Sequence, residues 1–468
     1  MLRTACLPAI ALAFSFLATG CAGAPPPPVE YATASPAVRE GLADLARRAV
    51  SADAAVADQA VAALRAAGPA GLDALFAEWP GAIAGLGGTG TSAPDPGGAA
   101  PDPARLRSAL ERVARQRDAH AAHLYWYTDL DEAKRAARAA HKPILSLRLL
   151  GDLDEELSCA NSRFFRTTLY PDPAIGALLR RGFVLHWKSE RPAPRITIDF
   201  GDGRRMERTL TGNSIHYVLD DEGRPVDALP GLYGPAAFLR GISAAREAAL
   251  GAMALGGDER SAYLRAYHAR AGGAIDAAWA AEVAALGAPG APLPMPIGSP
   301  SGTPTAALAA PVAPSKAAAE RPIVAALQGP VPQLDTPVRP EVWAAVVARH
   351  AGDARLDEHS RALMRRKIAR ELDPSGARLV PLDEPTFARR VTAFERVLAE
   401  DTLRNELSLH RTLHAWLSAP EPPEGLEELN RTVYASLFLT PRQDPWLGLL
   451  APDGYSAIDG EGLVLGRR

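Results

Sequence analysis

Residues 129–149, DLDEAKRAARAAHKPILSLRL, decide how the middle of this 468-residue chain should fold. A helical pattern starts at Thr128, with Asp131 three positions later, and ends near His141. The period then changes, because Pro143 to Leu149 is an apolar run with the length of a buried strand. This transition from helix to strand is the beginning of an α/β pattern.

The residues that follow continue the pattern. Five further strands are predicted, and they span Phe183–Trp187, Arg195–Phe200, Met206–Thr211, Ile215–Leu219 and Pro225–Leu229. Gly201-Asp202-Gly203 separates the second of these from the third and predicts a hairpin. A further helix begins at Pro235. The order predicts an α/β central domain with a mixed sheet covered by helices, flanked by mainly α-helical N- and C-terminal regions.

The order and spacing of four pieces of this segment resemble the thioredoxin-like family. They are the helix and strand of 129–145, the strand Phe183–Trp187, the terminal hairpin of 218–231 and the last helix from Tyr233-Gly234-Pro235. The resemblance covers residues 124–250, under a third of the chain. It implies a thioredoxin-like fold for the central domain.

The resemblance also implies where any chemistry lies. The family carries a Cys-x-x-Cys pair after its first core strand, and the matching stretch here is Ser158-Cys159-Ala160-Asn161-Ser162. Cys159 therefore matches the catalytic cysteine, and Ser162 replaces the second one. The family's cis-proline is matched by Ser214. The substrate groove implied by the resemblance is lined by Asn161, Arg163, Asn213 and Ser214.

Two interpretations of Cys159 are open. A helix N-terminus favours a thiolate, so Cys159 could carry out monothiol exchange, although Ser162 could not release a bound partner by intramolecular attack. Alternatively, Cys159 is a small buried apolar residue. We expect the second case, in which the domain is a non-catalytic protein-interaction module that contacts a protein partner near Asn213.

The N-terminus predicts export and a lipid anchor. Arg3 and the apolar run Leu7–Leu17 are typical of a signal peptide, and Leu17-Ala18-Thr19-Gly20-Cys21 is similar to a bacterial lipobox. We expect a lipid on Cys21 to attach the chain to a membrane of the cell envelope, facing the periplasm. Ala22 favours the outer membrane over the inner one.

Changes in composition divide the chain into eight segments. We predict a signal peptide (1–20), a Pro-rich tether (21–34), a helical HEAT-like region (35–80), a Gly/Pro linker (81–103), the thioredoxin-like domain with its entry helix (104–250), a helical extension (251–287), a Pro/Ala linker (288–320) and a mainly helical C-terminal domain (321–468).

The C-terminal segment offers a weak metal pattern. Glu406, His410 and His414 recur every four residues, so they share one stripe of a helix and could hold a transition metal. Leucines lie beside this stripe, and we expect the histidines to be satisfied by neighbouring groups and the protein to need no cofactor. A metal-dependent activity in this region is a second alternative.

Other classes of function find little support. The formal net charge is −3, and no basic tract dominates any segment, which argues against nucleic-acid binding. The sequence has no phosphate loop, nucleophile-elbow serine or dinucleotide fingerprint.

Overall fold

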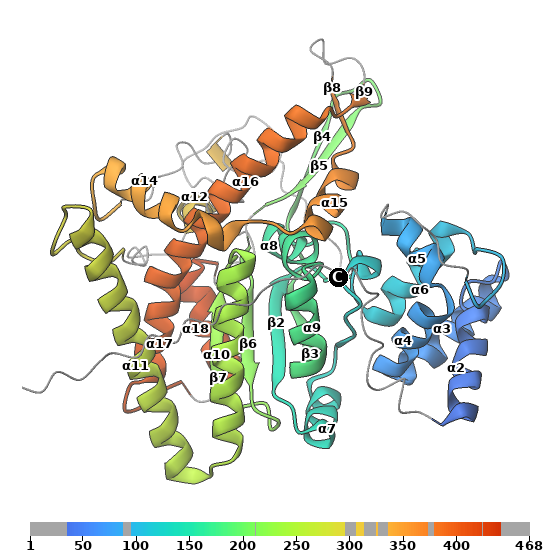
Figure 1. Ribbon diagram of the computed structural model, residues 1–468, viewed down its shortest axis with the longest axis horizontal. Helices are drawn as coiled ribbons and strands as arrows, with labels where there is room; N and C mark the ends of the chain where they lie inside the picture. The colour runs from blue at the N-terminus through green and yellow to red at the C-terminus, as the bar shows by residue number, and fades with distance from the viewer. Residues whose placement is uncertain are drawn as a thin grey trace, which may run out of the picture.

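The computed structural model describes most of the chain between residues 35 and 440 (Figure 1). The described ranges are 35–87, 95–210, 212–294, 306–312, 324–325, 336–372, 379–423 and 425–440. The predicted signal peptide, Cys21 and the Pro-rich tether lie outside them. Within these ranges, no helix has both the length and the apolar character needed to cross a membrane.

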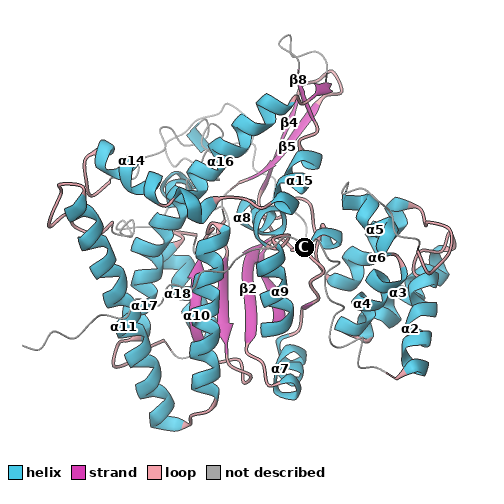
Figure 2. Ribbon diagram, in the orientation of Figure 1, coloured by secondary structure: helices cyan, strands magenta, loops and turns pink. Residues whose placement is uncertain are grey.

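A mixed five-stranded sheet lies at the centre of the molecule (Figure 2). Its strands are β1 (Trp126–Tyr127), β2 (Ile144–Leu150), β3 (Val184–Arg191), β6 (Ile215–Leu219) and β7 (Pro225–Pro230). They are ordered β1-β3-β2-β6-β7; β1, β3 and β2 run parallel, whereas β6 and β7 each run antiparallel to their neighbours. The predicted α/β class with a mixed sheet is therefore confirmed.

Helices of the central region cover the sheet. They are α7 (Leu130–Ala140), α8 (Ala160–Phe164), η2 (Phe165–Leu169), α9 (Pro173–Gly182) and α10 (Pro235–Met253), whereas η1 (Ala119–Ala121) packs into the N-terminal core. All seven residues of β2 are buried, Ser146 and Arg148 included, so both faces of this central strand are covered. On one face, the ring of His216 packs between Phe165 of η2 and Phe238 of α10, at centroid distances of 4.5 and 5.1 Å.

The opposite face of the sheet is polar and is covered by the C-terminal helix α18 (Leu426–Thr432). Alternate residues of a strand point to opposite sides of the sheet, so Ser146 and Arg148 of β2 share this face. Tyr217 of β6, which lies directly opposite Ser146, belongs to the same face. The Arg148 side chain is fully buried, and it pairs with Glu190 at 3.0 Å and with Glu427 of α18 at 2.8 Å. Tyr217 donates a hydrogen bond to Asn430 of the same helix at 3.2 Å. A helix from the C-terminal region thus covers the second face of the central sheet.

The predicted hairpin is present as a separate two-stranded sheet. Strand β4 (Arg195–Asp199) pairs antiparallel with β5 (Arg205–Thr209), and the positive φ angles of Gly201 and Gly203 close the turn between them. Phe200 at the turn has 54% of its surface exposed.

The N-terminal region has a hydrophobic core of its own. Its helices are α2 (Pro36–Arg48), α3 (Ala54–Ala66), α4 (Pro69–Glu78), α5 (Pro80–Gly87) and α6 (Pro103–Ala114). Helices α3 and α4 approach so closely that a Cβ atom at Gly71 would lie 1.9 Å from the carbonyl oxygen of Leu64. Two details differ from the sequence prediction. Helix α5 begins at Pro80 and extends into the predicted linker (81–103), where its first turn is capped by the Asp95 carboxylate. The predicted entry helix α6 packs into this N-terminal core.

The C-terminal region is mainly helical and shares one core with the sheet. Its elements are α11 (Gly257–Ala285), α12 (Ala306–Ala309), η3 (Ala310–Val312), α14 (Pro340–Arg349), η4 (Ala351–Ala354), α15 (Glu358–Lys367), β8 (Arg370–Leu372), β9 (Leu379–Pro381), α16 (Glu384–Arg404), η5 (Asn405–His410), α17 (Arg411–Leu417), α18 and η6 (Val433–Leu437). Elements α16, η5 and α17 form one continuous helical run, because no glycine or proline interrupts residues 386–419. Lys367 of α15 attaches this region to the central domain through an ion pair with Asp118 at 2.9 Å.

Candidate functional site

Cys159 caps the N-terminus of α8, directly after the loop that leaves the central strand β2. Its backbone N–H donates to the carbonyl oxygen of Leu150 at 3.0 Å, which holds the loop against the strand. The sulfur is fully buried and lies 3.0 Å from the hydroxyl oxygen of Ser214 and 3.4 Å from that of Ser162. The thiol is therefore enclosed between two hydroxyl groups.

Two of the other residues predicted for this site, Ser162 and Ser214, contact the sulfur. Ser162 donates its hydroxyl to the Cys159 carbonyl oxygen at 2.8 Å, so it is tied to the first turn of the helix. Asn161 donates a side-chain hydrogen bond to Asn213, and both are buried. Arg163 alone among the predicted residues is half-exposed. The structure thus brings together side chains that are more than fifty residues apart in the sequence.

The groove expected beside Asn213 is covered by the chain's own C-terminal helices. Tyr434 of η6 donates its hydroxyl to the Asn213 carbonyl oxygen at 3.1 Å. Burial raises the pKa of Tyr434 well above its ordinary value, so the hydroxyl keeps its proton and remains a donor. On the other side of α8, the ring of Phe164 packs on Phe394 of α16, with centroids 5.1 Å apart. Neither the sulfur nor the Asn213 edge is open to an outside protein.

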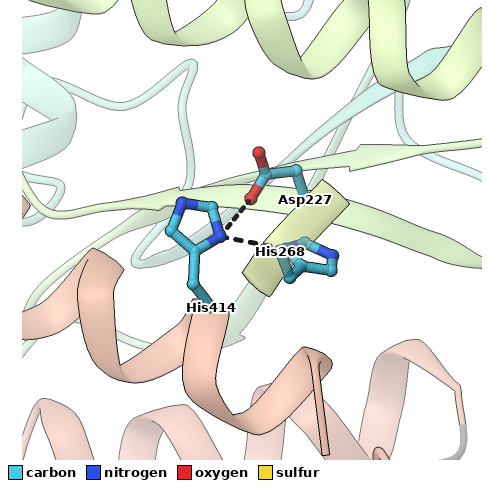
Figure 3. A group of neighbouring side chains, drawn as sticks. All are labelled: Asp227, His268 and His414. Carbon is cyan, nitrogen blue, oxygen red and sulfur yellow. Dashed lines mark hydrogen bonds and ion pairs between the residues drawn. The ribbon is translucent and has the colours of Figure 1, made fainter. Parts of the chain in front are cut away.

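A second cluster forms around the predicted stripe Glu406, His410 and His414. His410 Nδ1 is 3.0 Å from Glu406 Oε2, one helical turn earlier, and the His410 and His414 rings lie 4.1 Å apart. The stripe faces Asp227 of β7 through His410 and His268 of α11 through His414. Figure 3 shows His414 beside both Asp227 and His268. His414 Nδ1 lies 2.9 Å from His268 Nδ1 and 3.9 Å from Asp227 Oδ1.

The surroundings of His410 and His414 shift the pKa values of the two histidines in opposite directions. Burial opposes the charge on His410, but Glu406 and the hydrogen bond to Asp227 outweigh it and raise the pKa of His410 to about 10. Burial and the charge of His410 lower the pKa of His414 to about 3. Burial disfavours the Asp227 carboxylate, yet its contact with His410 lowers the pKa of Asp227 overall. The cluster therefore holds an ionised carboxylate, a cationic His410 and a neutral His414.

Nothing matches this chain among family models, curated proteins or solved structures. The two clusters are therefore interpreted from their own geometry.

The sequence alone does not single out Asp227 and His268. Asp227 is one residue of a predicted strand, and His268 lies in alanine-rich helical sequence. His268 and His414 are 146 positions apart, and no spacing rule joins residues at such a separation. A signal was nevertheless present, because an acidic residue inside the apolar run 225–230 requires a buried partner.

Proposed function

We propose that this chain is an exported lipoprotein, anchored through Cys21 and facing the periplasm, whose thioredoxin-like domain is a non-catalytic protein-interaction module. The anchor rests on the sequence pattern that ends at Cys21. The loss of thiol chemistry rests on the environment of Cys159.

The position of Cys159 and its contact with Ser214 support the thioredoxin-like assignment of the central domain. Cys159 stands at the start of a helix that follows the first core strand, where the resemblance puts the reactive cysteine. Ser214, which matches the family's cis-proline, stands directly before β6 and touches the sulfur. The mixed sheet, the terminal hairpin β6–β7 and the last helix α10 also agree with the resemblance.

The observation that carries the non-catalytic proposal is the enclosed sulfur. A thiol can exchange with a disulfide only when another sulfur atom reaches it in solution. Cys159 has no exposed surface, and the hydroxyl of Ser162 cannot act as a resolving thiol. In this proposal the domain keeps the fold and serves as a scaffold.

Alkylation of Cys159 tests this proposal against monothiol exchange. In native protein we expect no measurable labelling until the chain is unfolded in denaturant. The control introduces V38C into a C159S background, because Val38 is 53% exposed and its replacement should label rapidly. Fast labelling of native Cys159, with a midpoint below about pH 8.5, would overturn the non-catalytic proposal and favour exchange.

The anchor has a separate test. C21S should abolish incorporation of labelled fatty acid and move the protein from the membrane fraction to the periplasmic extract. C6S is the matched control, because Cys6 lies in the segment that we expect to be removed. Unchanged labelling of the C21S variant would refute the lipid anchor.

The surface that we propose for a protein partner is the tip of the hairpin β4–β5. Phe200 and Val38 are the large hydrophobic side chains exposed within the described ranges, and Phe200 stands on a hairpin outside the central sheet. Burying such a ring contributes about 1.5–3 kcal/mol. A photoreactive aromatic residue at position 200 should cross-link one discrete envelope protein in cells, whereas the same residue at position 38 should not. The purified partner must then bind F200S at least about tenfold more weakly than wild type; equal affinity would exclude this surface.

A further inference from the structure

Three segments that are distant in sequence meet beside the edge strand of the sheet. Asp227 belongs to β7, His268 to the long helix α11 and His414 to α17 (Figure 3). Each of the three residues is only 2% exposed. Placing two imidazoles and a carboxylate together in a protein interior is costly unless their polar atoms find strong partners.

The atoms that face one another are all metal-ligating atoms. One carboxylate oxygen and one ring nitrogen from each histidine lie within 4.8 Å of one another. In a tetrahedral site with bonds of about 2.0–2.1 Å, neighbouring ligand atoms are about 3.3 Å apart. The distances from His414 Nδ1, 2.9 Å to His268 Nδ1 and 3.9 Å to Asp227 Oδ1, lie on either side of that value.

We propose that Asp227, His268 and His414 bind a divalent transition metal of the zinc class, which clamps β7, α11 and α17 together. The ligand types indicate the class of ion. Two imidazoles with one carboxylate suit Zn²⁺ and its neighbours, whereas Ca²⁺ and Mg²⁺ prefer sites built from oxygen atoms. This inference is independent of the proposed function.

Surrounding groups orient the ligands as metal sites require. Tyr267 donates its hydroxyl to Asp227 Oδ2 at 2.5 Å, and the Ala228 N–H donates to Oδ1 at 2.8 Å. Such second contacts fix the ring and carboxylate orientations of ligands in known metal sites.

His410 is a positioning residue in this arrangement rather than a ligand. Its Nδ1 contacts Glu406, and its Nε2 lies 3.4 Å from Asp227 Oδ1, so it links the carboxylate to the helix that carries His414. Three protein ligands leave the fourth position of a tetrahedral zinc site to a water molecule, and the burial of all three residues keeps that position away from bulk solvent.

The test uses the full chain, stripped with a chelator, dialysed and titrated with Zn²⁺ alone. We expect one zinc per chain by elemental analysis and calorimetry, and a rise in Tm of about 5 °C or more at saturating metal. H414Q and D227N should each weaken zinc binding at least about tenfold. H359Q is the matched control, because the His359 side chain is 59% exposed and lies outside the cluster.

A second measurement keeps the proposal falsifiable if those variants fail to fold. Addition of Co²⁺ to the stripped wild-type protein should produce the intense visible absorption of a four-coordinate site, and Zn²⁺ should remove it. Loss of binding in H359Q as well, or stoichiometry well below one with no change in Tm and no Co²⁺ spectrum, would overturn the site and leave only a hydrogen-bonded histidine cluster.

Discussion

Replacing Tyr434 by phenylalanine should make Cys159 react faster with an alkylating reagent, although the sulfur itself is unchanged. The lost hydroxyl is the donor that holds η6 onto the Asn213 carbonyl oxygen at 3.1 Å. Y434F keeps the aromatic ring but leaves that buried carbonyl oxygen unpaired, which costs about 1–3 kcal/mol. The fold should survive, because the packing is preserved.

The expected rate follows from local opening. If the buried sulfur reacts only when the C-terminal helices open, the labelling rate is proportional to the population of the open state. A tenfold change corresponds to about 1.4 kcal/mol, so Y434F should label about 5- to 160-fold faster than wild type. Y217F should also accelerate labelling, because the Tyr217 hydroxyl donates a hydrogen bond to Asn430 and so holds α18, the helix before η6, onto the sheet.

The assay is intact-mass spectrometry of protein treated with iodoacetamide under native conditions. Y125F is the matched control, because the Tyr125 hydroxyl also donates to a carbonyl oxygen, that of Arg65 at 2.9 Å, but beside the N-terminal core. Y125F should leave the labelling rate unchanged. The same acceleration in Y434F and Y125F, or none in Y434F, would refute control of access by the C-terminal helices.

Three further predictions concern stability and use urea unfolding. F238A should lower the free energy of unfolding by about 3–5 kcal/mol, because Phe238 is buried, whereas F200A at the exposed hairpin tip should change it by less than about 0.5 kcal/mol; equal effects would contradict this. G71A should destabilise because its Cβ would overlap the backbone of α3, whereas G41A, with open space around it, should be neutral or stabilising by about 0.5–1 kcal/mol. Burial disfavours the charge of Asp118, but neighbouring basic groups lower its pKa overall in the folded protein. The ionised carboxylate therefore contributes to the free energy of unfolding above the unfolded pKa of about 4, and this contribution is lost as pH falls through the lower folded pKa. D118N should therefore lose less stability than wild type between pH 6 and 3, and identical pH profiles would exclude this assignment.

The strands and most helices could be predicted because their signals are local. Ile215–Leu219 is a strand with the predicted bounds, and the helix that starts at Pro235 follows from a proline at its first position. The helix start at Cys159 and its contact with Ser214 followed from the resemblance.

The rest depends on contacts between distant segments. The stripe of Glu406, His410 and His414 was visible in the sequence, but the carboxylate and imidazole that face it were not. Likewise, no local signal indicates that α18 covers the polar face of the sheet, because Glu427 and Asn430 read as ordinary polar residues of a surface helix.

The cover over that polar face sets an order of folding. The core of the N-terminal bundle is complete once the ribosome has released residues 42–119. The polar face of the central sheet stays exposed to water until residues 426–438 have been synthesised and have packed on it. Pairings at such sequence separation form slowly, and until then Arg148 lacks its Glu427 partner. A chain truncated after α10 would therefore be incompletely folded and prone to aggregation, and would not be an independently folding domain.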